Sequence, residues 1–224
     1  MVVFVSFDDG DHWQSLQLNL PHASARDLVV HDDDLVVATH GRGFWVLDDI
    51  TPLRQAGEEV AKANAFLFRP ADAFILPPYS ENGTPQPRDE PLAENAPYGA
   101  IIDYYLKSDA SGPVALEIVS PAGDVVRRFS SEDKLTPVDP NTLDIPASWV
   151  PAPTRLPASA GMHRWTWNLR PPPPADSTRG GGGAAVFGGR GAPPVLPGTY
   201  TVRLTVGGKQ LTQPLRVKAD PRAK

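Results

Sequence analysis

Proline is the residue that most constrains the fold of this chain. It occurs 26 times in 224 residues, more than twice the roughly 5% of average proteins. Each proline inside a helix costs about 3 kcal/mol, so a mainly helical fold is disfavoured. Between the prolines and the 19 glycines, short apolar runs alternate with turn residues, as strands do. We therefore expect an all-β chain.

Composition and charge exclude several classes of function. The formal net charge of −5 provides no basic surface for nucleic acid or an anionic membrane. No apolar run approaches the roughly 20 residues that span a bilayer, and residues 1–7 lack the basic region and cleavage site of a signal peptide. Because cysteine is absent, the chain has no disulfide, thiol nucleophile or Cys-ligated zinc. We expect no nucleic-acid partner, membrane span, metal or cofactor.

Residues 2–18 predict a β-hairpin with a highly specified turn. A β-branched and aromatic run precedes the turn, and a run that alternates apolar and polar residues follows it. Ser6 and Asp8 carry short acceptors that can bond the N–H groups of the turn. Gly10 permits a positive φ, and Trp13 can cover the turn. Each of these four residues therefore has a structural role.

The pattern Ser-x-Asp-x-Gly-x-x-Trp formed by these four residues matches the Asp box. It resembles the repeat of sialidase-like and sortilin-like β-propellers, in which the box joins the two outer strands of a blade. Asp8, Asp9 and Asp11 also suggest a calcium loop, but the EF-hand spacing and its bidentate Glu are absent. The resemblance implies a structural Asp box without a metal.

Residues 26–49 predict an antiparallel meander of three strands, at 27–31, 34–40 and 43–48, joined by tight polar turns. A propeller has about four blades or more. By the resemblance, residues 1–50 are thus the terminal segment of a propeller whose other blades lie elsewhere. A free-standing small sheet is the alternative. The open edge of an incomplete blade can also recruit a strand, which would give self-association.

Antiparallel strand directions place the two acidic turns of this segment at one end of the meander. The other end carries His22, in the connection 19–25, and His40 and Arg42, in the turn 39–43. Propellers of this superfamily bind substrates opposite their Asp boxes. The resemblance therefore makes His22, His40 and Arg42 candidate binding residues for a carbohydrate or protein ligand.

Residues 51–95 predict a connector. Thr51 can cap a short helix over 51–63, and Pro52 suits its first turn. Two apolar pieces at 65–70 and 73–76 follow, which we expect to pack against the propeller flank. Residues 77–95 then form a proline-rich linker.

Residues 96–224 predict a β-sandwich with two long Pro- and Gly-rich loops. Trp165 and Trp167 share one face of a strand and are expected in its core, whereas Trp149 is a candidate surface binding residue. The role of the Gly-rich loop 180–192 stays open; no phosphate-loop lysine follows it. The predicted strands are 100–107, 114–120, 125–129, 162–169, 199–206 and 210–218.

The later segments Trp-Thr-Trp-Asn-Leu-Arg, Pro-Gly-Thr-Tyr-Thr-Val-Arg-Leu and Ala-Asp-Pro-Arg are similar to the immunoglobulin-like module of the flagellar hook-capping protein. That module also follows Asp-box propellers in exported bacterial proteins described as glycosyl hydrolases. The resemblance implies an extracellular or periplasmic location.

Two functions follow as expectations. The first is a non-catalytic carboxy-terminal binding or scaffold portion of an exported Asp-box propeller protein, acting in attachment or in carbohydrate or protein binding. The alternative is a glycoside hydrolase-like enzyme whose site uses His22, His40 and Arg42. The chain has no Gly-x-Ser-x-Gly or His-Glu-x-x-His motif, and we assign no catalytic residue.

Overall fold

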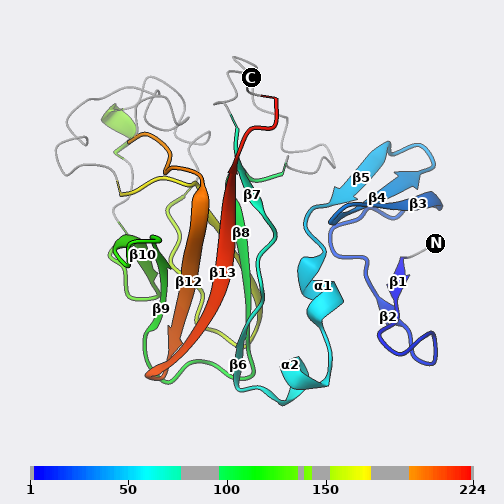
Figure 1. Ribbon diagram of the computed structural model, residues 1–224. Coiled ribbons are helices and arrows are strands. Elements are labelled where there is room, and N and C mark those ends of the chain that lie inside the picture. The colour runs from blue at the N-terminus through cyan, green and yellow to red at the C-terminus, as the bar shows by residue number, and fades with distance from the viewer. Residues whose placement is uncertain (1–2, 77–95, 136–138, 143–151, 173–191, 223–224) are drawn as a thin grey trace. The chain divides into compact units, whose positions relative to one another are not determined.

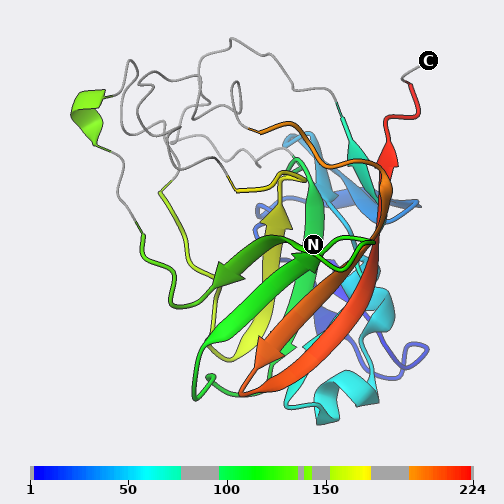
Figure 2. The ribbon, with the colours of Figure 1, turned by 60° about the vertical axis from the view of Figure 1, so that its left-hand side comes forward.

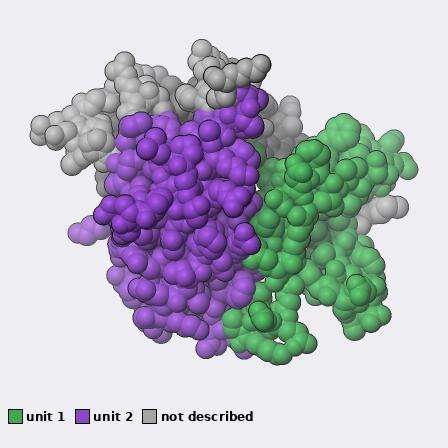
Figure 3. Space-filling view, in the orientation of Figure 1, with its two compact units in different colours: residues 1–63, 86–97 green, residues 64–85, 98–224 purple. Residues whose placement is uncertain are grey.

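The computed structural model describes residues 3–76, 96–135, 139–142, 152–172 and 192–222, which are all-β apart from three short helices (Figure 1). The chain divides into two compact units (Figure 3). Residues 3–63 form most of the first unit, and residues 64–76 with the described residues from 98 onward form the second. The all-β class predicted from the sequence is confirmed. The linker at 77–95, Trp149 and residues 180–191 of the Gly-rich loop lie outside the described residues.

The first unit contains a small hairpin and a three-stranded sheet. Strands β1 (Phe4–Val5) and β2 (Gln14–Ser15) pair antiparallel as a sheet of their own. Strands β3 (Ala25–His31), β4 (Asp34–Thr39) and β5 (Phe44–Leu47) form an antiparallel meander with β4 in its centre. The meander strands lie where the sequence predicts them. The hairpin strands are shorter than predicted, because only two residues of each run are paired.

The single connector helix predicted after residue 50 is wrong. Two helices are present, α1 (Thr51–Gln55) and α2 (Glu58–Lys62), separated by a break that includes extended backbone at Gly57. Glycine disfavours a helix by about 1 kcal/mol relative to alanine, which explains the break. The predicted cap at Thr51 is also wrong. Thr51 is the first helical residue, and its own N–H and hydroxyl donate to Asp49 Oδ1, at 3.0 and 2.5 Å.

The second unit is built from two sheets (Figure 2). The strand order is β10-β9-β12-β13-β7 in one sheet and β11-β8-β6 in the other. All neighbouring strands are antiparallel except β7, which runs parallel to β13. A 3₁₀ helix, η1 (Pro140–Thr142), lies between β10 and β11. The strands are β6 (Ala65–Leu67), β7 (Ala73–Ile75), β8 (Ala100–Leu106), β9 (Val114–Val119), β10 (Val125–Ser130), β11 (Gly161–Trp167), β12 (Gly198–Val206) and β13 (Lys209–Ala219).

The apolar pieces expected to pack against a propeller flank are instead strands of the second unit. Strand β6 pairs with β8, and β7 pairs with β13 in the other sheet. The chain crosses from one sheet to the other between Leu67 and Ala73, through Pro70. Proline has no N–H to donate, so it suits a point where a strand leaves its ladder.

Side chains from the two sheets form one hydrophobic core. Ile102 of β8, Leu116 of β9 and Val202 of β12 are fully buried within it. Trp167 is also fully buried, and Trp165 packs partly buried against the same cluster. The predicted core role of these two tryptophans is confirmed.

Gly99, which precedes β8, marks a close approach between backbone segments. Its φ is +124°, and a Cβ added there would lie 2.1 Å from the carbonyl oxygen of Trp167. The backbone angle is one that L side chains rarely adopt, and the space is already occupied by main chain. The start of β8 therefore depends on glycine at this position.

We expect Gly99→Ala to lower the free energy of unfolding of the second unit by at least about 2 kcal/mol, because strain and a backbone clash combine. Gly112→Ala is the matched control, since no atom lies within 4 Å of a Cβ added there. It should change stability by no more than about 0.5 kcal/mol. Urea unfolding followed by tryptophan fluorescence measures both variants. Equal losses would contradict this account of Gly99.

Candidate functional site

The turn between β1 and β2 is held together by its own polar side chains. Ser6 Oγ accepts the N–H of Gly10 at 2.8 Å and donates to Asp8 Oδ1 at 2.9 Å. Asp8 Oδ1 also accepts the N–H of His12 at 2.9 Å, and Asp8 Oδ2 lies 2.6 Å from the Nδ1 of the same histidine. The Trp13 ring lies beside Gly10, 3.7 Å from where a Cβ would be. Ser6 and Asp8 thus bond turn N–H groups as their residue types predict.

These bonds act on the ionisation of the turn. The pKa of the Asp8 carboxyl is lowered from its ordinary 3.8, first by the His12 backbone N–H and then by the His12 ring and the Ser6 hydroxyl. Hydrogen bonds donated to a carboxylate favour its charged form. The bonds that define the turn therefore favour the ionised acid.

The second acidic turn, between β3 and β4, is also bonded within the first unit. Asp33 forms an ion pair with Arg54 of α1 at 2.6 Å, and Asp34 Oδ1 accepts the N–H of Asp49 at 2.9 Å. The carbonyl oxygen of Asp33 accepts the N–H of Ile50 at 2.6 Å. These bonds fasten the turn to the segment that enters α1. The aspartates thus serve the fold, and the contacts do not arrange them as an acid–base pair.

The opposite end of the meander brings together the two segments that carry the predicted binding residues. The N–H of His40 donates to the carbonyl oxygen of Ser24 at 2.9 Å, which joins the turn 39–43 to the connection 19–25. The side chains of His22, His40 and Arg42 are exposed. The Arg42 carbonyl accepts the indole N–H of Trp45 at 3.0 Å. This end therefore presents two imidazoles and a guanidinium to solvent.

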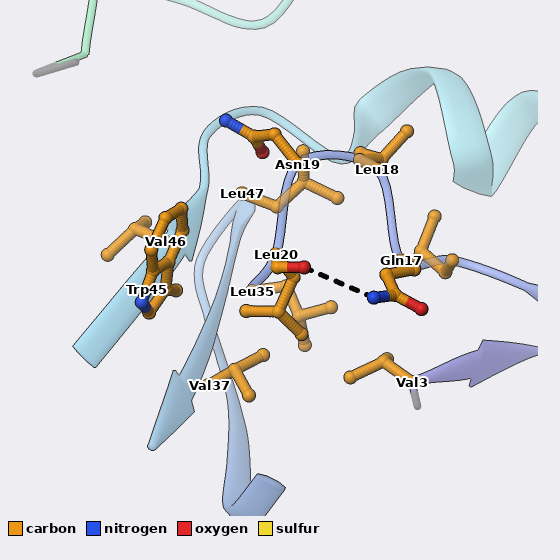
Figure 4. Close-up of a pocket in the computed structure, with 11 residues that line it drawn as sticks. Val3, Gln17, Leu18, Asn19, Leu20, Leu35, Val37, Trp45, Val46 and Leu47 are labelled. Carbon is orange, nitrogen blue, oxygen red and sulfur yellow. Dashed lines mark hydrogen bonds between the residues drawn. The ribbon is translucent and has the colours of Figure 1, made fainter. Parts of the chain in front are cut away.

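An apolar pocket, which the sequence did not indicate, lies beside this meander (Figure 4). Segment 16–20 and strands β4 and β5 line it, and it encloses about 380 Å³ that is partly open to solvent. Its polar side chains are Gln17, whose Nε2 donates to the Leu20 carbonyl at 3.2 Å, and Asn19. Because its lining has no titratable or nucleophilic side chain, the pocket is suited to holding an apolar group.

One face of the meander is covered by the chain itself over β4, while Leu28 and Val30 of β3 on the same face stay about half exposed. Leu35 and Val37 of β4 point to this face and are 7% and 5% exposed. Val3, Leu16 and Leu20 pack with them in the small core of the first unit. The face that carries Leu35 and Val37 is called the covered face.

The other face, called the open face, is apolar across its centre and carries Asp27, His31 and Asp34 toward the ends of β3 and β4. The register places Val29 of β3, Val36 of β4 and Val46 of β5 opposite one another, so all three share this face. Phe44 lies two residues before Val46 on the same face and is 79% exposed, and Val29 and Val46 are about half exposed. An antiparallel sheet normally presents polar residues on a solvated face. An apolar face of this kind is typical of a sheet that packs against another layer.

The Asp8 titration is a direct test of the hairpin turn. We expect a pKa below 3.8 for this carboxyl in the folded chain. Because the folded value is lower than the unfolded one, the stabilisation is complete above the unfolded value and is lost as pH falls through the folded value. The ¹³C shift of the carboxyl group, followed by NMR, gives the pKa. Ser6→Ala should raise it by removing a donor, and a wild-type value of 3.8 or more would contradict the turn geometry.

Neither the described residues nor the comparisons with known proteins assign a function directly. In the described part of the chain, no helix is long and apolar enough to cross a membrane. Among the same residues, no three His, Asp or Glu side chains gather as metal ligands would. The chain matches no protein-family model, no curated protein and no solved structure. Function is therefore inferred from the residues and contacts of the chain itself.

Proposed function

We propose that this chain is the non-catalytic carboxy-terminal binding or scaffold portion of an exported Asp-box propeller protein. The first unit is the end of the propeller, and the second unit is an immunoglobulin-like module that spaces or attaches it. The location, extracellular or periplasmic, follows from the same resemblance. The observation that carries the proposal is that the meander of the first unit is apolar on both faces while only one is covered.

A propeller blade explains both the sheet and its turn. Each blade packs face to face against two neighbours, so a blade needs apolar residues on both faces. Phe44 is 79% exposed, so in an isolated sheet its ring would bury little apolar surface. The bonds of Ser6 and Asp8 give the hairpin turn the fixed shape that a repeated structural corner needs. The open face is then the surface that packs against the next blade.

The strand order of the second unit supports an immunoglobulin-like module. Sandwiches of this class place consecutive strands in two sheets with Greek-key connections. Here β8 lies in one sheet, β9 and β10 in the other, β11 returns to the first, and β12 and β13 to the second. The first two strands, β6 and β7, divide between the sheets. Such a rigid module suits attachment or spacing.

In this proposal, the ligand binds at the end of the meander opposite the turn that carries Asp33 and Asp34. His22, His40 and Arg42 are exposed there and can bond hydroxyl or carboxylate groups of a carbohydrate or protein. The alternative, a glycoside hydrolase, needs two carboxyl groups about 5 to 9.5 Å apart across the scissile bond. The acidic turns instead bond within the fold. These contacts favour binding of a ligand without its hydrolysis.

Substitutions on the two faces test whether the open face lacks a cover in this chain. Phe44→Thr keeps a strand-forming residue and should change the free energy of unfolding of the first unit by less than about 0.5 kcal/mol. Val37→Ala on the covered face should cost about 2 kcal/mol. Urea unfolding measures both, and Phe44→Thr should also reduce binding of the apolar dye ANS. A cost above about 1 kcal/mol for Phe44→Thr would mean that the face is already buried.

A turnover assay separates the two functions. The purified chain should not hydrolyse aryl glycosides or aryl esters, because the described residues place no acid–base pair at the exposed histidines. The readout is release of the coloured phenol. Hydrolysis that is abolished in His40→Ala and retained in His31→Ala, an exposed histidine of β3, would establish the hydrolase instead.

A further inference from the structure

Strand β3 is an unprotected edge of the three-stranded sheet. Six of its seven residues pair with β4, the ladder is irregular at Arg26, and no strand in the described part of the chain pairs with its other side. Leu28, Val29 and Val30 in its centre are 47%, 51% and 53% exposed. Edge strands of stable monomers are usually short, bulged or interrupted by charges or proline. The centre of β3 carries three apolar β-formers in succession, which favours the addition of another strand.

The charges at the ends of β3 are complementary to the same strand turned around. When two copies pair antiparallel with Val29 opposite Val29, Asp27 of each copy lies opposite His31 of the other. Leu28 of each copy then lies opposite Val30 of the other. Oppositely charged cross-strand neighbours stabilise a pair of strands, and like charges destabilise it. An N–H of the His31 ring can donate to the Asp27 carboxylate in either charge state of the ring.

Neighbouring registers lack this match. Two residues that lie directly opposite each other must point to the same face of the sheet. A symmetric pair of strands can therefore be centred on a residue but not between two residues, so the nearest alternatives to Val29 are Val30 and Leu28. Centring on Val30 places His31 opposite Val29 and leaves Asp27 beyond the end of the partner's β3, which ends at His31. Centring on Leu28 places Asp27 opposite Val29 and leaves the charges without partners. Val29 is therefore the centre that the sequence of the edge selects.

The end groups are available for such pairing. Asp27 Oδ1 accepts the N–H of the next residue at 2.8 Å, which leaves its second oxygen open to solvent. His31 Nδ1 lies 3.8 Å from the Asp32 carboxylate, and the two side chains are 78% and 90% exposed. Exposed contacts of this length contribute little, so pairing with a second chain displaces no strong bond.

We propose that a second copy of this chain adds its β3 antiparallel to β3, centred on Val29, so that two meanders join into one six-stranded sheet. The interface forms through the backbone of the free β3 edge, and the side chains of Asp27, Val29 and His31 lie on the open face. The proposed function depends on a layer that covers this face, so different measurements test the two ideas. A monomeric chain would overturn the dimer and leave the test of the open face unchanged.

Cysteine cross-linking tests the register. The chain has no cysteine of its own. In the proposed pair, Val29→Cys places two thiols on directly opposite residues, about 4.5–5.5 Å apart between Cα atoms and within the range of a disulfide. Leu28→Cys is the matched control, because its two copies lie diagonally, about 7–8 Å apart. With oxidised glutathione, Val29→Cys should form covalent dimers at least about fivefold faster than Leu28→Cys. Equal rates, or faster reaction of Leu28→Cys, would overturn the register.

A charge swap tests the pairing without a cross-link. His31→Glu places two carboxylates opposite each other twice in the symmetric dimer, so the association constant should fall about tenfold. The double variant Asp27→Lys/His31→Glu places Lys opposite Glu and should restore it. Sedimentation velocity over a range of concentrations measures the association, and circular dichroism checks that each variant is folded. A wild-type chain that stays monomeric, or a His31→Glu variant that associates as well as wild type, would overturn the proposal.

Discussion

Every apolar face of a β-sheet needs a covering layer, and this requirement separates the two halves of the chain. In the second unit, two sheets cover each other and bury residues such as Ile102, Leu116 and Trp167 completely. Burial of apolar surface is the main driving force for folding, and the two sheets of this unit provide that burial for each other. In the first unit, one sheet has two apolar faces and a cover for only one. The larger β assembly proposed above would supply the layer that covers the second face.

Local polar bonds partly compensate for this small core. The turn at Asp8 and the turn at Asp33 and Asp34 are fixed by side chains that bond backbone N–H groups or Arg54. Such bonds shape corners without burying apolar area, and each contributes little to stability because its groups are exposed to solvent. They define where each strand begins, but they do not cover the apolar face of the sheet or pair its outer strand. The same division explains why the aspartates of these turns serve the fold and why apolar side chains of the meander stay exposed.

Sequence reasoning located most strands because their signals are local. Period-two alternation and the Gly207-Gly208 turn, whose residues both have positive φ, mark β12 and β13 within one residue at each end. Pairing partners are not local, so the three-residue strands β6 and β7 were assigned to the wrong neighbour. At the site, the positions of His22, His40 and Arg42 followed from strand direction, but the pocket did not. Its lining depends on a bend at Leu18, where φ is 44°. Leucine seldom adopts this angle, and no pattern in the sequence predicts it.

Native-state hydrogen exchange on the whole chain measures directly whether the first unit is incomplete. Amides of β4, the central strand of the meander, should open with a free energy well below that of β9 and β12, because one of the two faces around β4 has no cover. Protection of β4 equal to that of β9 and β12 would show a self-sufficient sheet. That result would contradict the central claim that this half of the molecule is part of a larger β assembly.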